Sequence, residues 1–262
     1  MKADKLLQAL EQRGIHTIIG VPDSTLKQFC DGLQNYKGNI NHYVPVNEGA
    51  AVGLAVGSYL ADGKPACVYM QNSGIGNAVN PIASLANRDV YGIPMLFLVG
   101  WRGEPGVKDE PQHVFQGEIT CKLFEVLSIP YEVIDKDTTW EQMESILTEA
   151  FETLSGGEQF AIIVRKGTFE KDVPYTWENG NTLNREEALA TILKEGGHEA
   201  ILVSTTGKIS RELYEQSDAL YGTHENIFMT VGGMGHASMI ALGIAKKRPK
   251  EKIMCIDGDG AA

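Results

Sequence analysis

Apolar and polar residues alternate along the chain in a pattern typical of strands separated by helices. Short apolar runs predict strands near residues 15–20, 40–45, 66–70, 94–99, 131–134 and 160–164. Apolar residues at helical spacing predict helices between the later strands, at about 48–61, 76–87, 113–128 and 139–154. Six strands that alternate with helices favour an α/β fold with a doubly wound parallel sheet.

Two further helices are expected near the start of the chain. The opening segment MKADKLLQAL has the spacing of an amphipathic helix, and Gly14 is placed to end it. Ser24 is placed to cap the next helix, which carries Leu26, Phe29 and Leu33.

A second series of elements begins at Asn184, after a stretch without helical period that is rich in Gly, Asn and charge. Asn184 is expected to cap a helix, with Glu187 at the capping-box position. Three strands follow, in AILVST, NIFMTV and KIMCID. Three strands make half of a doubly wound domain. We therefore expect a complete domain at 1–168, a linker at 169–184 and the N-terminal half of a second α/β domain at 185–262.

Composition and charge narrow the classes of function. A net charge of −11 argues against nucleic acid as a partner, and an anionic substrate would need a local basic patch to receive it. The four cysteines lie far apart without a CxxC pair, which fits neither a zinc site nor a disulfide framework. No apolar run approaches the roughly 18 residues of a membrane span. We expect a cytoplasmic protein with reduced thiols and no membrane partner.

Glycine-rich loops follow three of the predicted strands, where open α/β sheets bind ligands. In YMQNSGIGNAVN, Gly74 allows a ligand to approach the backbone and Asn77 offers hydrogen bonds; a tight turn with an Asn cap is the alternative. In DGDGAA, the carboxylate of Asp259 between Gly258 and Gly260 suits a hard cation such as Mg²⁺, although an ordinary turn would also fit.

The remaining loop, VGGMGHASM, leaves a rival interpretation open. Gly233-x-Gly235 at the start of a helix is similar to a dinucleotide loop, and Asp257 lies roughly where a ribose-binding acid would lie. The third glycine of that motif is replaced by Ser238. A Rossmann nucleotide-binding protein therefore stays a remote alternative. The segment STTGKIS is not a P-loop, because Ile209 stands where Ser or Thr must follow Gly-Lys.

Glu48 stands at the start of a helix of unusually small residues, EGAAVGLAVGS. Each glycine costs such a helix up to about 1 kcal/mol relative to alanine, so three glycines indicate very close packing against another helix or a cofactor. A capping acid at a helix N-terminus is the plain explanation. Its position after an apolar strand, in a sheet with Gly-rich loops, favours a catalytic acid in a poorly solvated place.

Taken together, these segments resemble thiamine diphosphate-dependent decarboxylases, and within them the phosphonopyruvate decarboxylases. The resemblance rests on GVPDSTLK, VPVNEGAAVGLAVG, QNSGIGNAVNP, GWRGEPGVKDEPQH and VSTTGKISREL, which are spread over nearly the whole chain. It implies non-oxidative decarboxylation of 3-phosphonopyruvate to phosphonoacetaldehyde and CO₂, in phosphonate biosynthesis. It also implies thiamine diphosphate and Mg²⁺ as cofactors, an aminopyrimidine-binding first domain and a diphosphate-binding second domain. A homo-oligomer with the cofactor at the subunit interface is expected.

The resemblance also implies roles for single residues. Glu48 would share a proton with N1′ of the pyrimidine, the carbonyl of Gly232 would meet the pyrimidine amino group, and Met234 would hold the cofactor bent. Asp259 would bind Mg²⁺ within the GDG motif. Asp23 and Ser24 lie close to the expected substrate position, and His113 could shuttle a proton unless it is a plain loop histidine.

Three basic residues are candidates for binding an anion. Arg102 and Lys108 lie in the charged loop 101–112, which is either a lid that pairs the phosphonate or a solvated surface segment. Lys208 is a candidate contact for the diphosphate or the substrate.

Two further alternatives stay open. Sulfopyruvate differs only in its anionic head group, and these motifs do not separate the two substrates. The chain could also be a non-catalytic subunit or fragment, because family members run roughly a third longer and their metal motif continues to an asparagine that this sequence lacks. We therefore expect a chain cut within its second domain.

Overall fold

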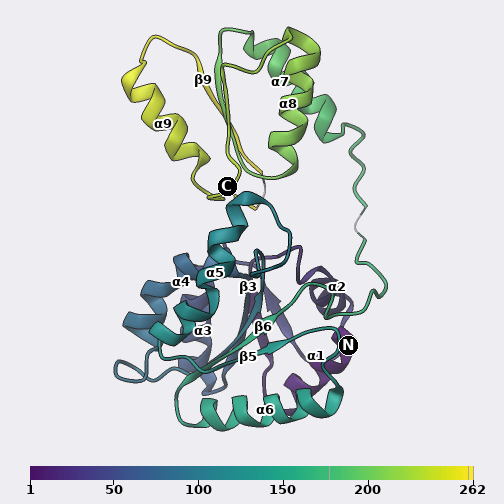
Figure 1. Cartoon of the computed structure of the whole chain (residues 1–262), viewed down its shortest axis with the longest axis vertical. Coiled ribbons are helices and arrows are strands. Elements are labelled where there is room, and N and C mark those ends of the chain that lie inside the picture. Colours follow the sequence, from purple (N-terminus) through teal and green to yellow (C-terminus); the bar gives the residue numbers. More distant parts are fainter. Residues whose placement is uncertain (177, 259, 262) are drawn as a thin grey trace. The chain divides into compact units, whose positions relative to one another are not determined.

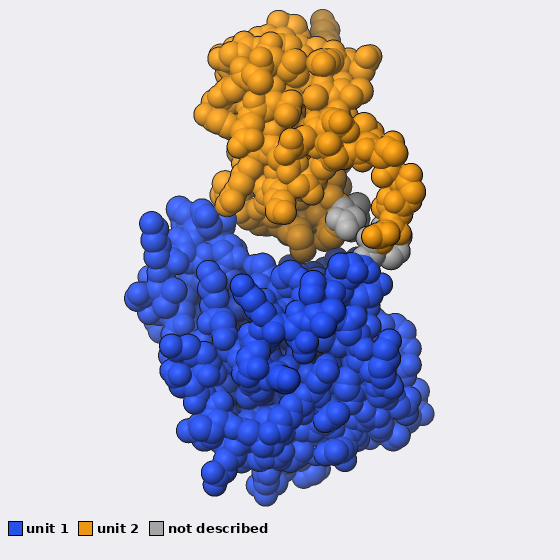
Figure 2. All heavy atoms as spheres, turned by 90° about the vertical axis from the view of Figure 1, so that its right-hand side faces the viewer, with its two compact units in different colours: residues 1–176 blue, residues 177–262 orange. Residues whose placement is uncertain are grey.

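The computed structural model describes residues 1–176, 178–258 and 260–261. The chain forms two compact units, Met1–Thr176 and Trp177–Ala262, which are coloured separately in Figure 2. Each unit has its own parallel sheet and its own core.

The first unit is built on a six-stranded parallel sheet of order β2-β1-β3-β4-β6-β5. Its strands are β1 (Thr17–Gly20), β2 (Asn41–Tyr43), β3 (Ala66–Gln71), β4 (Met95–Gly100), β5 (Tyr131–Ile134) and β6 (Gln159–Val164). The chain leaves β1 toward β2 on one side and returns to β3 on the other. Because the strand order reverses between β1 and β3, a crevice is expected outside their carboxyl ends.

Helices cover both faces of this sheet (Figure 1). They are α1 (Ala3–Gln12), α2 (Lys27–Asn35), α3 (Glu48–Asp62), α4 (Ile75–Pro81), α5 (Pro111–Val126) and α6 (Trp140–Ser155), with short turns η1 (Asn72–Gly74) and η2 (Ile82–Ala86) flanking α4. The helices α1, α2 and α6 pack on one face, and α3, α4 and α5 pack on the other. The unit is thus a three-layer α/β sandwich, as the alternation of elements predicts.

The core forms because successive residues of a strand point to opposite faces. In β4, Leu96 and Leu98 join the layer beneath α1, α2 and α6, whereas Phe97 and Val99 join the layer beneath α3, α4 and α5. Both faces of the sheet are therefore apolar, which is why its central strands are nearly continuous hydrophobic runs.

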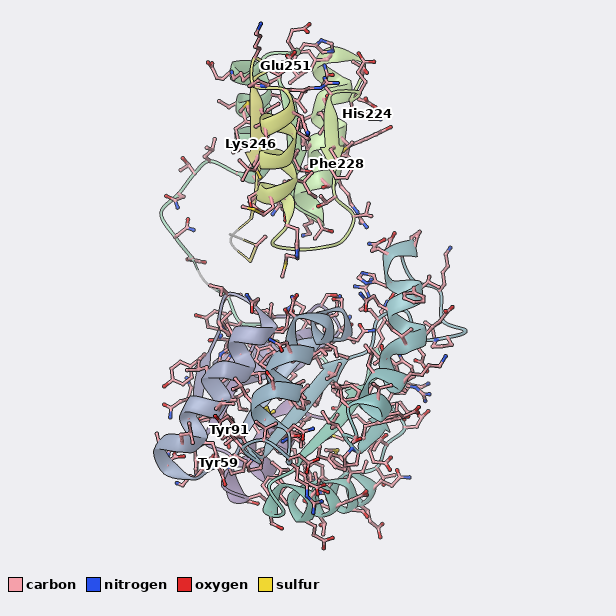
Figure 3. All side chains as sticks on the ribbon, turned by 90° about the vertical axis from the view of Figure 1, so that its left-hand side faces the viewer. Tyr59, Tyr91, His224, Phe228, Lys246 and Glu251 are labelled. Carbon is pink, nitrogen blue, oxygen red and sulfur yellow. The ribbon has the colours of Figure 1, made fainter. Side chains whose placement is uncertain are left out.

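The second unit holds a three-stranded parallel sheet of order β8-β7-β9. Its elements are α7 (Arg185–Gly196), β7 (Ile201–Ser204), α8 (Lys208–Tyr221), β8 (Ile227–Met229), α9 (Ala237–Lys247) and β9 (Ile253–Ile256). Leucines of α7 and α8 pack with Leu202, while Ala237 and Ala241 of α9 pack with Val203 on the other face. Phe228 of β8, labelled in Figure 3, is exposed.

Of the two helix caps expected from the sequence, one is present and one is not. The capping box of α7 is present, because the Asn184 side chain accepts from the Glu187 N–H and the Glu187 side chain accepts from the Asn184 N–H. The cap expected at Ser24 is wrong: α2 begins at Lys27, and its N-cap residue Leu26 makes no side-chain cap. The Asp23 carboxylate instead accepts from the N–H groups of Thr25 and Leu26, in the turn that precedes α2.

The segment after β6 contributes to the first unit. Phe169, which the sequence assigns to the linker, is buried and packs on Phe29 with ring centroids 5.7 Å apart. The N-terminal amine donates to the Thr168 carbonyl at 3.0 Å, and the Glu170 N–H donates to the Met1 carbonyl at 2.9 Å. In the described part of the chain, no helix is long and apolar enough to cross a membrane.

The central strand offers a direct test of this core. Phe97 is 1% exposed on β4, so Phe97→Ala should lower the free energy of unfolding by about 3–5 kcal/mol. Val126, at the end of α5, is 81% exposed, so Val126→Ala should change it by less than about 0.5 kcal/mol. Equilibrium urea unfolding of the full chain, followed by far-UV circular dichroism, measures both. If both substitutions lower the free energy of unfolding by the same amount, the assignment of Phe97 to the core is contradicted.

Candidate active site

The candidate residues of the first unit gather at the carboxyl edge of the sheet. Tyr59 near the end of α3 and Tyr91 before β4 lie at the other edge, where the strands begin (Figure 3). Glu48, Gly74, Arg102 and the loop after β1 all follow the ends of strands. Parallel sheets bind ligands at this edge.

The side-chain amide of Asn72 joins the ends of β3 and β4 to α5. Its oxygen accepts from the Arg102 N–H at 3.0 Å, and its nitrogen donates to the Arg102 carbonyl and to the Thr120 hydroxyl, both at 2.8 Å. Asn72 is 1% exposed, so these bonds replace all contact of the amide with water. The turn η1 is therefore fixed on one side to the loop that carries Arg102.

On its other side, η1 lies against Glu48. Glu48 is the first residue of α3, one position after the N-cap Asn47, whose side chain accepts from the Ala50 N–H at 2.8 Å. Glu48 is 7% exposed, and its Oε2 accepts from Asn77 Nδ2 at 2.9 Å. A Cβ at position 74 would overlap the carboxylate, so only glycine leaves room for it there.

The Glu48 carboxylate is buried but not fully paired. Within the described residues, its Oε1 has no hydrogen-bond partner. This oxygen is not among the fully buried atoms without partners, so it stays accessible to solvent. The positive end of the α3 dipole favours the negative charge of the carboxylate. The carboxylate is thus held in place with one oxygen available to a ligand.

Asp23 follows β1 and is 7% exposed. Its Oδ2 accepts from the N–H groups of Thr25 and Leu26 at 3.0 and 3.1 Å, and Gly100 at the end of β4 leaves the space that the carboxylate occupies. Its Oδ1 is buried without a partner. Burial raises the pKa of Asp23, although the two N–H donors and Arg102 oppose that rise. The protonated acid is therefore favoured more than in an exposed aspartate.

Arg102 lies in the loop after β4, and two other residues bind its side chain. Its Nε donates to Asp109 Oδ2 at 2.8 Å, its Nη2 donates to Asp109 Oδ1, and its Nη1 donates to Ser24 Oγ at 3.2 Å. The predicted substrate residues Arg102 and Ser24 are therefore in contact. Lys108 is exposed in the same loop, and Pro111 starts α5 within the segment considered as a lid.

His113 stands in the first turn of α5 and faces the same loop. Its backbone packs so closely on Gly103 that a Cβ at 103 would overlap it. Its Nδ1 is buried without a partner. Burial, followed by the nearby Arg102, lowers the pKa of His113, which favours the neutral imidazole at neutral pH.

Buried side-chain atoms that lack partners gather at this edge. They include Asp23 Oδ1, Thr25 Oγ1 and His113 Nδ1. Buried polar atoms in folded proteins nearly always have a partner, so a group of unsatisfied ones indicates a ligand or ordered water. The edge between β1, β4 and α5 therefore offers unpaired polar atoms to which a polar ligand could bind.

Two residues of this site, Asp109 and Thr25, are not predicted from the sequence. Asp109 is the residue that pairs with Arg102. A signal for Asp109 exists, because an acid that follows an arginine by seven positions across Gly103 and Gly106 can close a loop onto it. The partners of Asn72 could not be read in this way, because Arg102 and Thr120 reach it only through the fold.

In the second unit, the remaining candidates follow the ends of β7, β8 and β9. Lys208 is the exposed first residue of α8, after Gly207 with φ of 94°. Gly232 and Met234 lie in the loop between β8 and α9, and Met234 is 42% exposed. Gly258 and Gly260 follow β9. Asp259, the predicted metal ligand, lies outside the described residues.

A network of hydroxyl groups supports this edge of the second unit. Ser210 Oγ contacts Ser204 Oγ at 2.8 Å and donates to the Thr205 carbonyl at 2.6 Å, and Thr230 Oγ1 donates to the Ser204 carbonyl at 2.9 Å. The network ties the loops after β7 and β8 together. No group of three His, Cys, Asp or Glu side chains within the described residues is arranged to hold a metal.

Comparison with known proteins identifies the family. Residues 2–125 match the model "Thiamine pyrophosphate enzyme, N-terminal TPP binding domain"; thiamine pyrophosphate is another name for thiamine diphosphate. Phosphonopyruvate decarboxylase of Streptomyces hygroscopicus is 31% identical over 279 residues, which cover 100% of this chain and 67% of that protein. The chain thus spans about two thirds of the length of this relative.

Two further proteins are similar over part of the chain. Sulfopyruvate decarboxylase subunit alpha of Methanococcus maripaludis is 34% identical over 129 residues, covering 49% of this chain and 74% of that subunit. The structure of benzoylformate decarboxylase from Polynucleobacter necessarius aligns with a TM-score of 0.49 at 15% identity, covering 78% of this chain and 39% of that one. On the match of the N-terminal domain and the identity over its full length, this chain belongs to the family of thiamine diphosphate-dependent decarboxylases that includes phosphonopyruvate decarboxylase.

Proposed function

We propose that the protein decarboxylates 3-phosphonopyruvate to phosphonoacetaldehyde and CO₂ with thiamine diphosphate and Mg²⁺. The observation that carries the proposal is the Glu48 carboxylate, which is buried, held by Asn77 and open to a ligand at one oxygen. The identity to phosphonopyruvate decarboxylase over the whole chain supports the substrate.

The Glu48 site fits the aminopyrimidine of thiamine diphosphate. A ring nitrogen of the pyrimidine can share a proton with Oε1, the oxygen that has no other partner in the described structure. Gly74 supports the fit, because any larger residue would displace the acid. When bound, the cofactor supplies the electron sink that decarboxylation of a 2-oxo acid requires.

The second unit would hold the diphosphate end. Asp259, between Gly258 and Gly260, would bind Mg²⁺, a hard cation that takes a few carboxylate oxygens together with phosphate oxygens. Lys208 at the start of α8 would add a positive charge and a helix N-terminus, both of which favour phosphate groups. Gly232 and Met234 would contact the cofactor from the loop before α9. These roles rest on the sequence motifs.

The substrate would lie against Asp23, Ser24 and Arg102. Asp23, whose pKa is raised by burial, would lie near the reacting carbon, where its protonated form would limit repulsion of an anionic substrate. His113, as a neutral imidazole, would accept or pass on a proton at Nδ1. Lys108 would be a second, exposed contact for the anionic head group.

We expect the protein to work in the cytoplasm as a homo-oligomer with its cofactor at the interface between copies. Free cysteines support a reducing compartment: Cys30, Cys67, Cys121 and Cys255 are all unpaired. On α3, Gly53 and Gly57 have nothing within contact distance of a Cβ position, so the helix offers a flat surface for close packing.

Sulfopyruvate is the second candidate substrate. It is favoured by the 34% identity to a sulfopyruvate decarboxylase alpha subunit over about half of this chain. Phosphonate and sulfonate are both tetrahedral oxyanions, so the same arginine would bind either one.

The first prediction concerns the substrate. The purified protein, as its cell makes it, should release CO₂ from 3-phosphonopyruvate with thiamine diphosphate and Mg²⁺, at a kcat/KM at least about tenfold above that for pyruvate and also above that for sulfopyruvate. A factor of ten corresponds to about 1.4 kcal/mol of transition-state binding, which one charge-assisted hydrogen bond can supply. A preference for sulfopyruvate would transfer the assignment to the second candidate, and release from none of the three would refute both.

The second prediction concerns the acid. Glu48→Gln should lower kcat by about 10²–10⁴-fold, because the amide cannot exchange a proton, while the cofactor still binds. Cofactor binding is followed by calorimetry and kcat by CO₂ release. Glu132→Gln is the matched control, since Glu132 is an exposed glutamate on β5, and it should leave kcat unchanged. A fully active Glu48→Gln enzyme would refute the proposed role.

The third prediction concerns pH. The pKa of Asp23 is higher in the folded protein than in the unfolded chain. Between these two pKa values the folded protein binds more protons than the unfolded chain, so the free energy of unfolding falls as pH rises through that range. Asp23→Asn removes the penalty, so it should raise Tm at neutral pH and less so near pH 4, while lowering kcat about 100-fold or more. Scanning calorimetry across pH checks the first part. If the gain in Tm of Asp23→Asn over wild type is smaller at neutral pH than near pH 4, that part of the prediction is contradicted.

A further inference from the structure

Asp109 uses both of its carboxylate oxygens to hold the loop after β4. Its Oδ2 accepts from Arg102 Nε and from the Gly103 N–H, both at 2.8 Å. Its Oδ1 accepts from Arg102 Nη2 and from the Glu110 N–H, the latter at 2.8 Å. The Arg102 guanidinium is the main reason that the pKa of Asp109 lies well below its usual range. The charged form of Asp109 is therefore favoured, and each of its oxygens already accepts two hydrogen bonds.

The guanidinium of Arg102 is fixed by this pair but not used up. A guanidinium carries five N–H donors. Three of them donate to Asp109 and Ser24. Two are thus left without an acceptor in the part of the chain that the structure describes, one on Nη1 and one on Nη2. Nη1, which carries one of them, also donates to Ser24, on the loop where Asp23 Oδ1 is buried without a partner.

The backbone of Arg102 is fixed as firmly as its side chain. The Asn72 amide binds both its N–H and its carbonyl. The next residue, Gly103, packs directly on α5. Because backbone and side chain are both held, the two remaining donors point in a set direction. Ordered donors of this kind are what bidentate recognition of an oxyanion requires.

Asp109 also balances the charge of Arg102, and this separates two ways of binding an anion. If the positive charge alone attracts the anion, removal of the Asp109 charge should strengthen binding. If the direction of the two free N–H groups matters more, the same change should weaken binding, because the guanidinium is released to rotate. The two accounts predict effects of opposite sign.

We propose that Asp109 is a positioning residue that aims the free N–H groups of Arg102 at the oxyanion head group of the substrate and so selects phosphonate- or sulfonate-bearing 2-oxo acids over pyruvate. This inference rests on the proposed function, since it assigns part of the same site. Asp109 itself touches no substrate.

The test compares Asp109→Asn with wild type. The variant should lose at least about tenfold in kcat/KM for 3-phosphonopyruvate, mostly through a higher KM, and change less than about threefold for pyruvate. Asp135→Asn is the matched control, because it removes a carboxylate from Arg165 at the end of the neighbouring strand β6 and should change neither value. A gain or no change with phosphonopyruvate, or an equal loss with both substrates, would overturn the inference.

Two additions keep the test decisive. Arg102→Lys keeps the charge but lacks the planar fork, so it should show the same selective loss. Adding Asp109→Asn to it should then have little further effect, because the second residue acts through the first. If the losses in kcat/KM of the two single variants add fully in the double variant, the inference is overturned. If Asp109→Asn fails to fold, the selective loss is still measured in Arg102→Lys.

A binding measurement separates this inference from the proposed function. Titration of 3-phosphonopropionate, which has the head group but no keto group to react, is followed by ³¹P NMR. Wild type should bind it at least about tenfold more tightly than Asp109→Asn. If wild type binds 3-phosphonopropionate more tightly in this way but releases no CO₂ from 3-phosphonopyruvate, the proposed function is refuted and the subsite is retained. Equal binding by both proteins would overturn the subsite whatever the enzyme does.

Discussion

The side-chain amide of Asn72 is the contact on which the arrangement of the first unit's site depends. It satisfies the N–H and the carbonyl of Arg102 and also the Thr120 hydroxyl, and it is almost entirely buried. Loss of the amide would leave buried backbone groups unpaired, which costs about 1–3 kcal/mol each. Since Asn72 also opens the turn that ends at Gly74, one residue sets the position of Arg102 on one side and of the Glu48 pocket on the other. The cofactor half and the substrate half of the proposed site therefore share a single anchor.

The glycines around this anchor are explained by the carboxylates beside them. Gly74 leaves room for Glu48 and Gly100 leaves room for Asp23. In both places the backbone passes so close to a buried acid that a methyl group would overlap it. The buried, unpaired Oδ1 of Asp23 reduces stability. Hydrogen bonds hold both acids in place, from the Asn77 amide to Glu48 and from two backbone N–H groups to Asp23. Such costs are typical of functional sites.

The sequence predicts the sheet and its helices well, because alternating apolar runs and helical spacing are local properties. The capping box at Asn184 was readable for the same reason: both partners lie within one turn. The cap expected at Ser24 is wrong because α2 begins only at Lys27, and the N–H groups of the preceding turn donate to the Asp23 carboxylate, whose burial beside Gly100 depends on the fold. Asp109 has only a weak local signal, the two glycines between it and Arg102, because its pairing depends on how the loop between β4 and α5 closes. Contacts between distant segments, such as Asn77 with Glu48, carry no local signature.

The charge of the chain makes the Arg102–Asp109 pair more informative than a free arginine would be. A protein of net charge −11 repels anions at a distance, so an anionic substrate gains little from the overall field. Because Asp109 neutralises Arg102, this arginine adds little long-range attraction either. Its contribution must come after contact, through the direction of its remaining N–H groups. Discrimination that arises after contact acts on how long the ligand stays bound rather than on how fast it arrives. A compensated arginine of this kind would therefore reject pyruvate by failing to retain it, while an oxyanion head group of the right geometry is held long enough to react.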